Sequence, residues 1–133
     1  MRRFILATAG LAFLSQMSIT VSAPAQVSVS YGVSDLSHIV ADSRGNELRF
    51  NRDFKGRSFD GVLAFRSVEA ALFSSTRYRV GFGKIMDGVD CSVTDKATLD
   101  RIIDWQSGRP VRVNGIIHTT LMGDVQLDDC TFN

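Results

Sequence analysis

The sequence predicts one small domain built mainly of β-strands, closed as a five-stranded Greek-key barrel with one helix before the strands and one between the third and fourth. Three observations lead to this fold class. After residue 56, short apolar stretches alternate with polar residues at the period of a strand. Two stretches, one before these strands and one among them, have helical spacing instead. Residues 26–133 form one domain of ordinary size, with no repeat or internal linker.

Residues 1–25 have the three parts of a bacterial signal peptide. Arg2 and Arg3 give a positive start, residues 4–14 are apolar, and Ala23-Pro24-Ala25 supplies the small–x–small pattern after which signal peptidase cuts. The apolar run is shorter than the ~20 residues of a membrane span. We therefore expect a periplasmic or secreted protein with no stable membrane span after cleavage. The short n-region favours the general export pathway over the twin-arginine pathway.

The predicted helix before the strands begins with Ser34 as its N-cap and stops near Lys55-Gly56. Gly45 weakens it in the middle. Apolar residues at helical spacing lie on both sides of this glycine: Leu36, Ile39, Val40, Leu48, Phe50 and Phe54.

Three strands follow, each with one buried face. Their inward residues are predicted to be Phe59, Gly61, Leu63 and Phe65, then Tyr78, Val80 and Phe82, then Val89, Cys91 and Val93. Residues 67–76 are expected to form an irregular connection, and Asp87-Gly88 a turn.

A helix capped by Thr94 or Asp95 comes next, and Ser107-Gly108 and Pro110 end it. Its predicted apolar stripe consists of Leu99, Ile102 and Ile103. The fourth strand then places Val111, Val113 and Ile117 inside.

The fifth strand follows a turn at Gly123-Asp124 and begins with Val125 and Leu127. Cys130 is out of phase with Leu127, which predicts a β-bulge at Asp128-Asp129 that turns Cys130 inward. The order helix, three strands, helix, two strands is the layout of the OB-fold.

The chain resembles the tRNA_anti-like OB-fold family of small bacterial domains over about residues 33–133. Three stretches carry the resemblance: Asn-Glu-Leu to Phe-Lys-Gly-Arg in residues 46–57, Val-Asp-Cys-Ser-Val in residues 89–93, and Gly-Arg-Pro-Val-Arg-Val-Asn-Gly in residues 108–115 with Val-Gln-Leu-Asp-Asp-Cys in residues 125–130. Phe50 departs from the small alanine of the family. The resemblance implies the OB-fold and brings no catalytic residues.

Cys91 and Cys130 are the two cysteines of the chain. In an OB barrel the third strand lies beside the fifth, so the two can be neighbours, and an oxidising compartment favours a disulfide. Closing a loop of about forty residues would stabilise the fold by ~4 kcal/mol in the chain-entropy model. The alternative is two separate buried thiols.

No metal site, cofactor or enzymatic activity is predicted. His38 and His118 are far apart in sequence and neither has ligand spacing to a cysteine or another histidine. The acidic residues around Asp124 and Asp128-Asp129 lack the alternating pattern of a calcium loop. No nucleophile elbow, phosphate-binding glycine loop or catalytic carboxylate pair is present.

The sequence favours a binding or structural module that engages a protein, peptide or glycan through the barrel face and the loops 67–76 and 118–123. The candidate ligand-binding residues are Arg77, Tyr78, Arg79, Trp105 and His118. For three of these residues a structural role is the alternative to ligand binding. Tyr78 shares the phase of the core residues, Trp105 can plug the barrel bottom, and His118 can be an ordinary surface residue.

Two other functions of the same fold are possible, a sugar-binding B-subunit of a pertussis-like toxin and a nucleic-acid-binding domain. Toxin subunits of that type usually carry more cysteines. The chain has 15 Lys and Arg against 14 Asp and Glu, and two of the arginines belong to the signal. Because the domain has no basic surplus and is exported, nucleic acid is not an expected partner.

Overall fold

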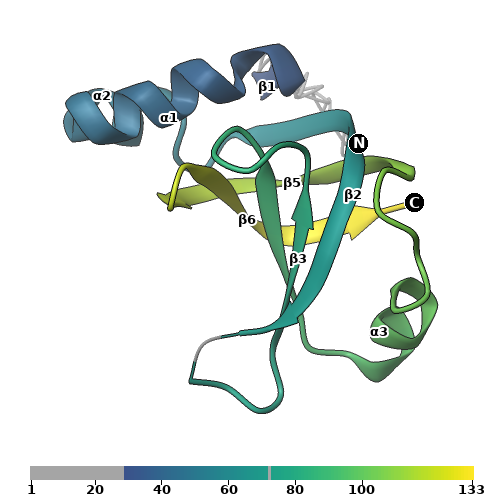
Figure 1. Cartoon of the computed structure of the whole chain (residues 1–133). Coiled ribbons are helices and arrows are strands. Elements are labelled where there is room, and N and C mark those ends of the chain that lie inside the picture. Colours follow the sequence, from purple (N-terminus) through teal and green to yellow (C-terminus); the bar gives the residue numbers. More distant parts are fainter. Residues whose placement is uncertain (1–28, 72) are drawn as a thin grey trace, which may run out of the picture.

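The computed structural model describes residues 29–71 and 73–133. The predicted signal peptide, residues 1–25, lies outside them. Five strands form a closed barrel (Figure 1), and their bounds are β2 (Ser58–Ala70), β3 (Tyr78–Phe82), β4 (Val89–Val93), β5 (Pro110–Leu121) and β6 (Asp124–Phe132). Their order is β2-β3-β4-β6-β5, and β2 also pairs with β5 to close the barrel. Only β4 and β6 are parallel within it. This topology confirms the predicted OB-fold.

Two helices precede the barrel where one weakened helix was predicted: α1 (Leu36–Gly45) and α2 (Glu47–Asp53), after a two-residue strand β1 (Ser30–Tyr31) and a 3-10 turn η1 (Val33–Asp35). The helix breaks after Gly45 because Asn46 leaves the helical conformation and caps α2, its side-chain oxygen accepting from the Arg49 N–H at 3.0 Å. The prediction of Ser34 as N-cap is wrong. Asp35 closes the first turn instead, accepting the Gly32 N–H at 2.8 Å.

The predicted strand phases are confirmed in the core. The fully buried residues with the largest side chains include Phe59, Val80, Phe82, Val89, Cys91, Val111, Val113, Ile117 and Val125. One boundary differs: β2 continues to Ala70, so residues 67–70 are strand and not irregular connection. These residues pair with β3. The register shifts just after Phe65, where β2 stops pairing with β5 and pairs with β3 alone. The backbone groups of residues 67–70 therefore find hydrogen-bond partners on β3, which the local sequence of this polar segment does not indicate.

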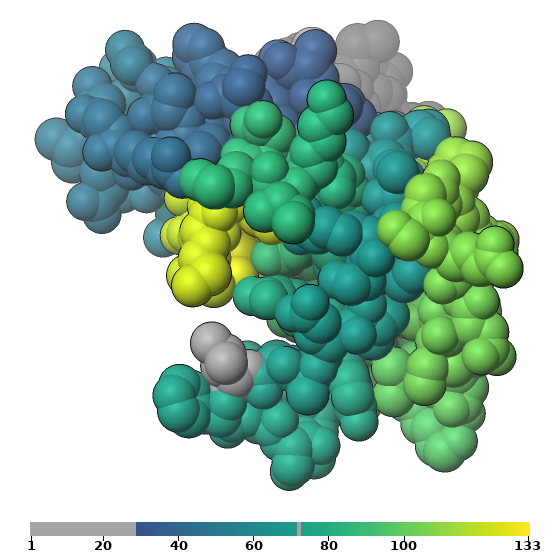
Figure 2. Space-filling model, viewed as in Figure 1, coloured from purple at the N-terminus to yellow at the C-terminus, as the bar shows by residue number. Residues whose placement is uncertain are grey.

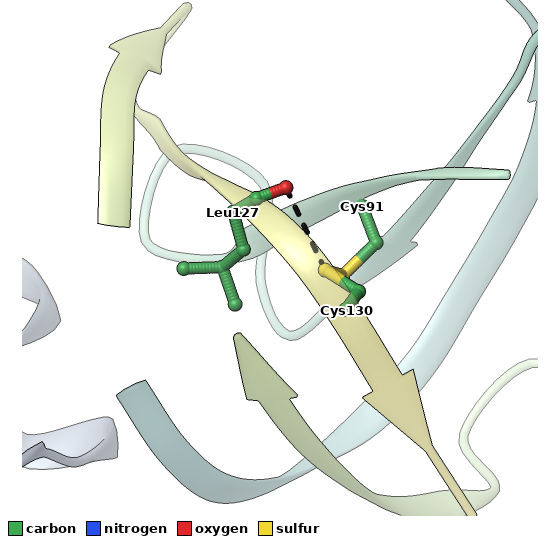
Figure 3. Close-up of a disulfide and its surroundings, with 3 residues drawn as sticks. All are labelled: Cys91, Leu127 and Cys130. Atoms are coloured by element: carbon green, nitrogen blue, oxygen red, sulfur yellow. Dashed lines mark hydrogen bonds between the residues drawn. A yellow bond between two sulfur atoms is a disulfide. The ribbon is translucent and has the colours of Figure 1, made fainter. Parts of the chain in front are cut away.

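The disulfide between Cys91 and Cys130 joins β4 to β6 (Figure 3), with a Cα–Cα distance of 6.0 Å. The ladder between these strands runs only from Val89–Val125 to Cys91–Leu127, so the covalent bond continues the connection where the backbone pairing ends. The predicted β-bulge is present one residue further along the chain than expected. Asp129 and Cys130 together lie opposite the single residue Gly115 of β5, and Asp129 has φ 51°.

The helix α3 (Lys96–Ile102) covers the bottom of the barrel and is capped as predicted, with Asp95 accepting the Thr98 N–H at 2.8 Å. Its predicted stripe is only partly correct: Ile102 is buried, whereas Ile103 is 61% exposed. Ile103 is the C-cap of α3 and still helical, but it lies one position around the helix from Ile102 and faces solvent, whereas Trp105 beyond the helix packs against the core. No helix in the described part of the chain is long and apolar enough to cross a membrane.

Candidate binding cleft

A cleft lies over the outer face of β3 and β4, between the loop 71–77 and the β5–β6 turn at residues 122–123. Figure 2 shows it as the hollow between the teal loop at the bottom and the yellow β5–β6 hairpin. It consists of two hollows of about 360 and 210 Å³ that share Arg79 and Asp90. The other residues that line it are Arg66, Ser67, Glu69, Ala71, Arg77, Gly81, Ile85, Cys91, Ser92, Leu121, Met122, Asp124, Gln126, Leu127 and Asp128. We call this surface the cleft.

The strand phase that builds the core also builds the floor of the cleft. Val80 and Phe82 point inward, so Arg79 and Gly81, which alternate with them along β3, face outward. Arg79 is paired with Ser92 and Gly81 with Asp90 across the β3–β4 ladder, and Asp90 is paired with Gln126 on β6. A row of polar side chains therefore crosses three strands.

In the larger hollow, one arginine is shared by two aspartates and connects the strands that form the floor of the cleft. The Nη2 atom of Arg66 donates to Asp90 Oδ1 at 3.0 Å and to Asp124 Oδ2 at 2.7 Å. The other oxygen of Asp124 accepts the Gly88 N–H at 3.0 Å. The two aspartate side chains are only 5% and 10% exposed and that of Arg66 is 21% exposed. This Arg66–Asp90–Asp124 cluster joins β2, β4 and β6 with the β3–β4 turn.

The cluster needs a glycine beneath it. A Cβ atom at Gly81 would lie 2.6 Å from Arg66 Nη2 and 2.8 Å from its Nε, closer than non-bonded atoms approach. The guanidinium therefore packs directly on the β3 backbone. Its other nitrogen, Nη1, is buried and has no hydrogen-bond partner within the described residues.

Burial raises the pKa of Asp90 above its ordinary value, and the negative charge of Asp124 raises it further, while Arg66 opposes both. One guanidinium shared by two buried carboxylates leaves one negative charge without a counter-charge inside the cluster. The floor is therefore acidic at this point, although the cleft as a whole holds arginines.

The rest of the floor carries both signs of charge. Arg79 donates to Glu69 at 2.9 Å across β2 and β3. The imidazole of His118 lies 3.1 Å from the Asp128 carboxylate. In the parts of the chain that the structure describes, Arg77 forms no ion pair, and it lies at the base of the loop 71–77.

Large apolar side chains stand exposed around the cleft. Phe73 is fully exposed at the tip of the loop 71–77, and Ile85 and Met122 are each 76% exposed on the opposite side. Both of these last two residues line the larger hollow. The cleft thus has a charged floor between apolar rims, the reverse of the apolar centre and polar rim of most protein interfaces.

The structure brings together some of the predicted ligand-binding residues and separates others. Arg77 and Arg79 line the cleft, and His118 reaches its margin through Asp128. Tyr78 is half-buried at the start of β3. Trp105 lies at the barrel bottom, where its ring contacts Phe65, Phe132 and the guanidinium of Arg109 (4.6 Å from its centre). This arrangement is that of a plug and not of an open stacking face.

Sequence reasoning missed the Arg66–Asp90–Asp124 cluster. The one local signal was Gly81, a glycine at an outward position of an otherwise regular strand, which often marks a close approach of another group. Among the described residues, no three His, Cys, Asp or Glu side chains gather as ligands of a metal ion.

Comparison with known proteins supports the fold. No family model matches the chain, and no curated protein matches it in sequence. Membership of the tRNA_anti-like family therefore stays a prediction. Among solved structures, a "putative nucleic acid-binding lipoprotein" from Klebsiella pneumoniae subsp. pneumoniae MGH 78578 superposes with a TM-score of 0.54 at 12% identity, over 79% of this chain and 91% of that one. A "putative aspartyl-tRNA synthetase" from Leishmania major Friedlin gives a TM-score of 0.48 at 11% identity, over 84% of this chain and 21% of that one.

The first of these structures corrects one prediction. Nucleic acid was not an expected partner, yet a protein of similar fold and extent is named for nucleic-acid binding. The prediction relied on the net charge of the whole domain. Net charge says nothing about where the arginines lie, and two of them, Arg77 and Arg79, lie together in the cleft.

Proposed function

We propose that this chain is an exported, non-catalytic binding module that holds an extended polypeptide segment in the cleft. The observation that carries the proposal is the mixed character of the floor, which offers guanidinium donors and carboxylate and amide acceptors side by side. An extended polypeptide presents N–H donors and C=O acceptors in alternation, together with apolar side chains for the rims.

Export is supported by two features. The predicted signal peptide precedes the domain, and the disulfide between Cys91 and Cys130 is of the kind that persists in oxidising compartments.

Arg79 and Arg112 provide a matched test of this site. Each forms an ion pair between neighbouring strands, Arg79 with Glu69 and Arg112 with Asp60, and only Arg79 lines the cleft. Peptides would be selected on the full mature chain from a random phage-displayed library, and their affinities measured by fluorescence anisotropy. We expect Arg79→Ala to weaken binding about tenfold and Arg112→Ala to leave it unchanged. Equal losses in both variants, or no selected peptide, would rule out this site.

A second candidate ligand is single-stranded nucleic acid. Two observations favour it: the exposed ring of Phe73 stands on the same short loop as Arg77, and the Klebsiella structure of similar fold is named for nucleic-acid binding. Base stacking on an aromatic ring with an arginine at the phosphate is the usual arrangement for such ligands.

Labelled single-stranded DNA and RNA oligonucleotides distinguish the two ligands. If nucleic acid is the ligand, binding weakens steeply with added salt and is lost in Phe73→Ala and Arg77→Ala. Retention of selected peptides without oligonucleotide binding at low salt would support the polypeptide proposal instead.

A further inference from the structure

Two methionines occupy neighbouring turns beside the cleft: Met122 lines its larger hollow, and Met86 follows Ile85, which lines the same hollow. The chain has four methionines, and Met86 and Met122 are the two that follow residue 28. Met86 lies in the β3–β4 turn and is 50% exposed, and Met122 lies in the β5–β6 turn and is 76% exposed. The turns touch, because a Cβ atom at Gly123 would lie 2.9 Å from the Met86 Cα atom.

Local backbone preference does not account for methionine at either position. Met86 has φ 72° and Met122 has φ 52°, in the left-handed region that side chains with a Cβ atom rarely adopt. Met122 and Gly123, which follows at φ 88°, are the two central residues of a hairpin turn with φ positive at both. Asparagine or aspartate before glycine is strongly preferred there. A methionine that is exposed and conformationally disfavoured points to a use of its side chain.

Thioethers at these positions are open to oxidants. Both cysteines of the chain are joined in the disulfide, so no thiol competes for peroxide. The sulfur lone pair attacks one oxygen of hydrogen peroxide, and an S–O bond forms as the O–O bond breaks. The proton of the attacked oxygen passes to the departing hydroxide, which leaves as water. Sulfur loses two electrons and peroxide gains them. The product, methionine sulfoxide, is polar where methionine was apolar.

We propose that Met86 and Met122 form a paired oxidation site that converts an apolar rim of the cleft into a polar one. Ile85, in the β3–β4 turn, and Leu121, the last residue of β5, directly precede them and are also exposed, so four apolar side chains lie together at this rim. Oxidation of both thioethers makes two of these four side chains polar and leaves the floor of the cleft unchanged. Methionine surfaces suit ligands of varied sequence, and a sulfoxide surface does not. The effect on ligand binding rests on the proposed function; the oxidation site itself does not.

The site is tested on the full mature chain by titration with hydrogen peroxide. Mass spectrometry of peptides would follow each methionine, and retention on a hydrophobic column would follow the apolar rim of the native protein. We expect one oxygen on Met86 and one on Met122, earlier elution, and reversal of both by methionine sulfoxide reductases. Protection of either methionine from peroxide, or unchanged retention after both are oxidised, would overturn the proposal.

Two variants separate oxidation from general damage. Met86→Leu/Met122→Leu keeps the rim apolar and should make retention insensitive to peroxide, while Met86→Gln/Met122→Gln should reproduce the oxidised protein without any oxidant. If selected peptides bind the native protein, oxidation should weaken them about fivefold to tenfold in the wild type and leave the leucine variant unaffected. Unchanged peptide affinity in the oxidised wild type would contradict the effect on binding. If the native protein binds no peptide at all, the proposed function fails, and mass and retention still decide the oxidation site.

Discussion

Replacement of Arg66 by methionine should destabilise the protein far more than loss of an ordinary surface ion pair. Methionine keeps most of the aliphatic stem and removes the charge. The variant leaves Asp90 and Asp124 buried, 5% and 10% exposed, with no guanidinium hydrogen-bonded to either carboxylate, although Arg79 stays near Asp90. Removing one partner of a buried ion pair costs about 3–5 kcal/mol, whereas an exposed pair contributes at most about 1 kcal/mol. Domains of this size are stable by about 5–15 kcal/mol, so the loss is a large part of the total.

The loss of stability in Arg66→Met should depend on pH, and the direction of the change follows from the pKa of Asp90. The pKa of Asp90 is already raised in the folded protein by burial and by Asp124, and Arg66 is the main group that lowers it. Without Arg66 the folded state binds protons still more tightly than the unfolded chain. The contribution of Asp90 to the free energy of unfolding of the variant therefore rises as the pH falls, and the difference from wild type shrinks.

Urea denaturation at about pH 7 and about pH 4.5, with the disulfide intact, measures both effects. The fluorescence of Trp105, the single tryptophan of the chain, reports unfolding because the ring is packed at the barrel bottom. A loss below about 1 kcal/mol at neutral pH, or an equal loss at both pH values, would refute the reasoning, since it would mean that water screens the cluster.

Two control variants isolate the charges. Arg66→Met/Asp90→Asn/Asp124→Asn removes all three charges, and asparagine can still accept the Gly88 N–H, so most of the lost stability should return. Asp90→Asn alone should not destabilise the protein at neutral pH, because the raised pKa means that folding disfavours the ionised carboxylate. A large loss in this single variant would contradict the assigned direction of the pKa shift.

Two further variants test the covalent and steric constraints. Replacing both Cys91 and Cys130 by alanine should cost about 4 kcal/mol in the chain-entropy model for a sequence separation of 39, measured by urea denaturation; an unchanged midpoint would contradict it. Gly81→Ala should cost about 1–3 kcal/mol because its Cβ atom would displace the Arg66 guanidinium, whereas Gly45→Ala, with nothing within 4 Å and a helical position, should stabilise the protein slightly. Equal effects at the two glycines would show that the close packing on Gly81 is not rigid.

The elements that sequence predicted best are those set by near neighbours in the chain. Alternation placed Val80 and Phe82 inside, and the cap at Asp95 depends on an N–H three residues away. Gly45 marked the weak point of the first helix, although the cap at Asn46 that divides it into two was not foreseen. The stripe of the second helix failed at Ile103, which keeps the helical conformation as the C-cap of α3 but points to solvent, one position around the helix from the buried Ile102.

By itself, the sequence determined which strand residues face the core, because strand periodicity is a property of the chain order, and it favoured a disulfide between Cys91 and Cys130 that the structure then showed. Only the tertiary structure decided the cleft. Arg66 meets Asp90 across 24 positions and Asp124 across 58, and the turns of Met86 and Met122 touch although 36 residues separate them. Contacts of this kind depend on how strongly the sheet bends and twists as it closes, a quantity that no local pattern encodes.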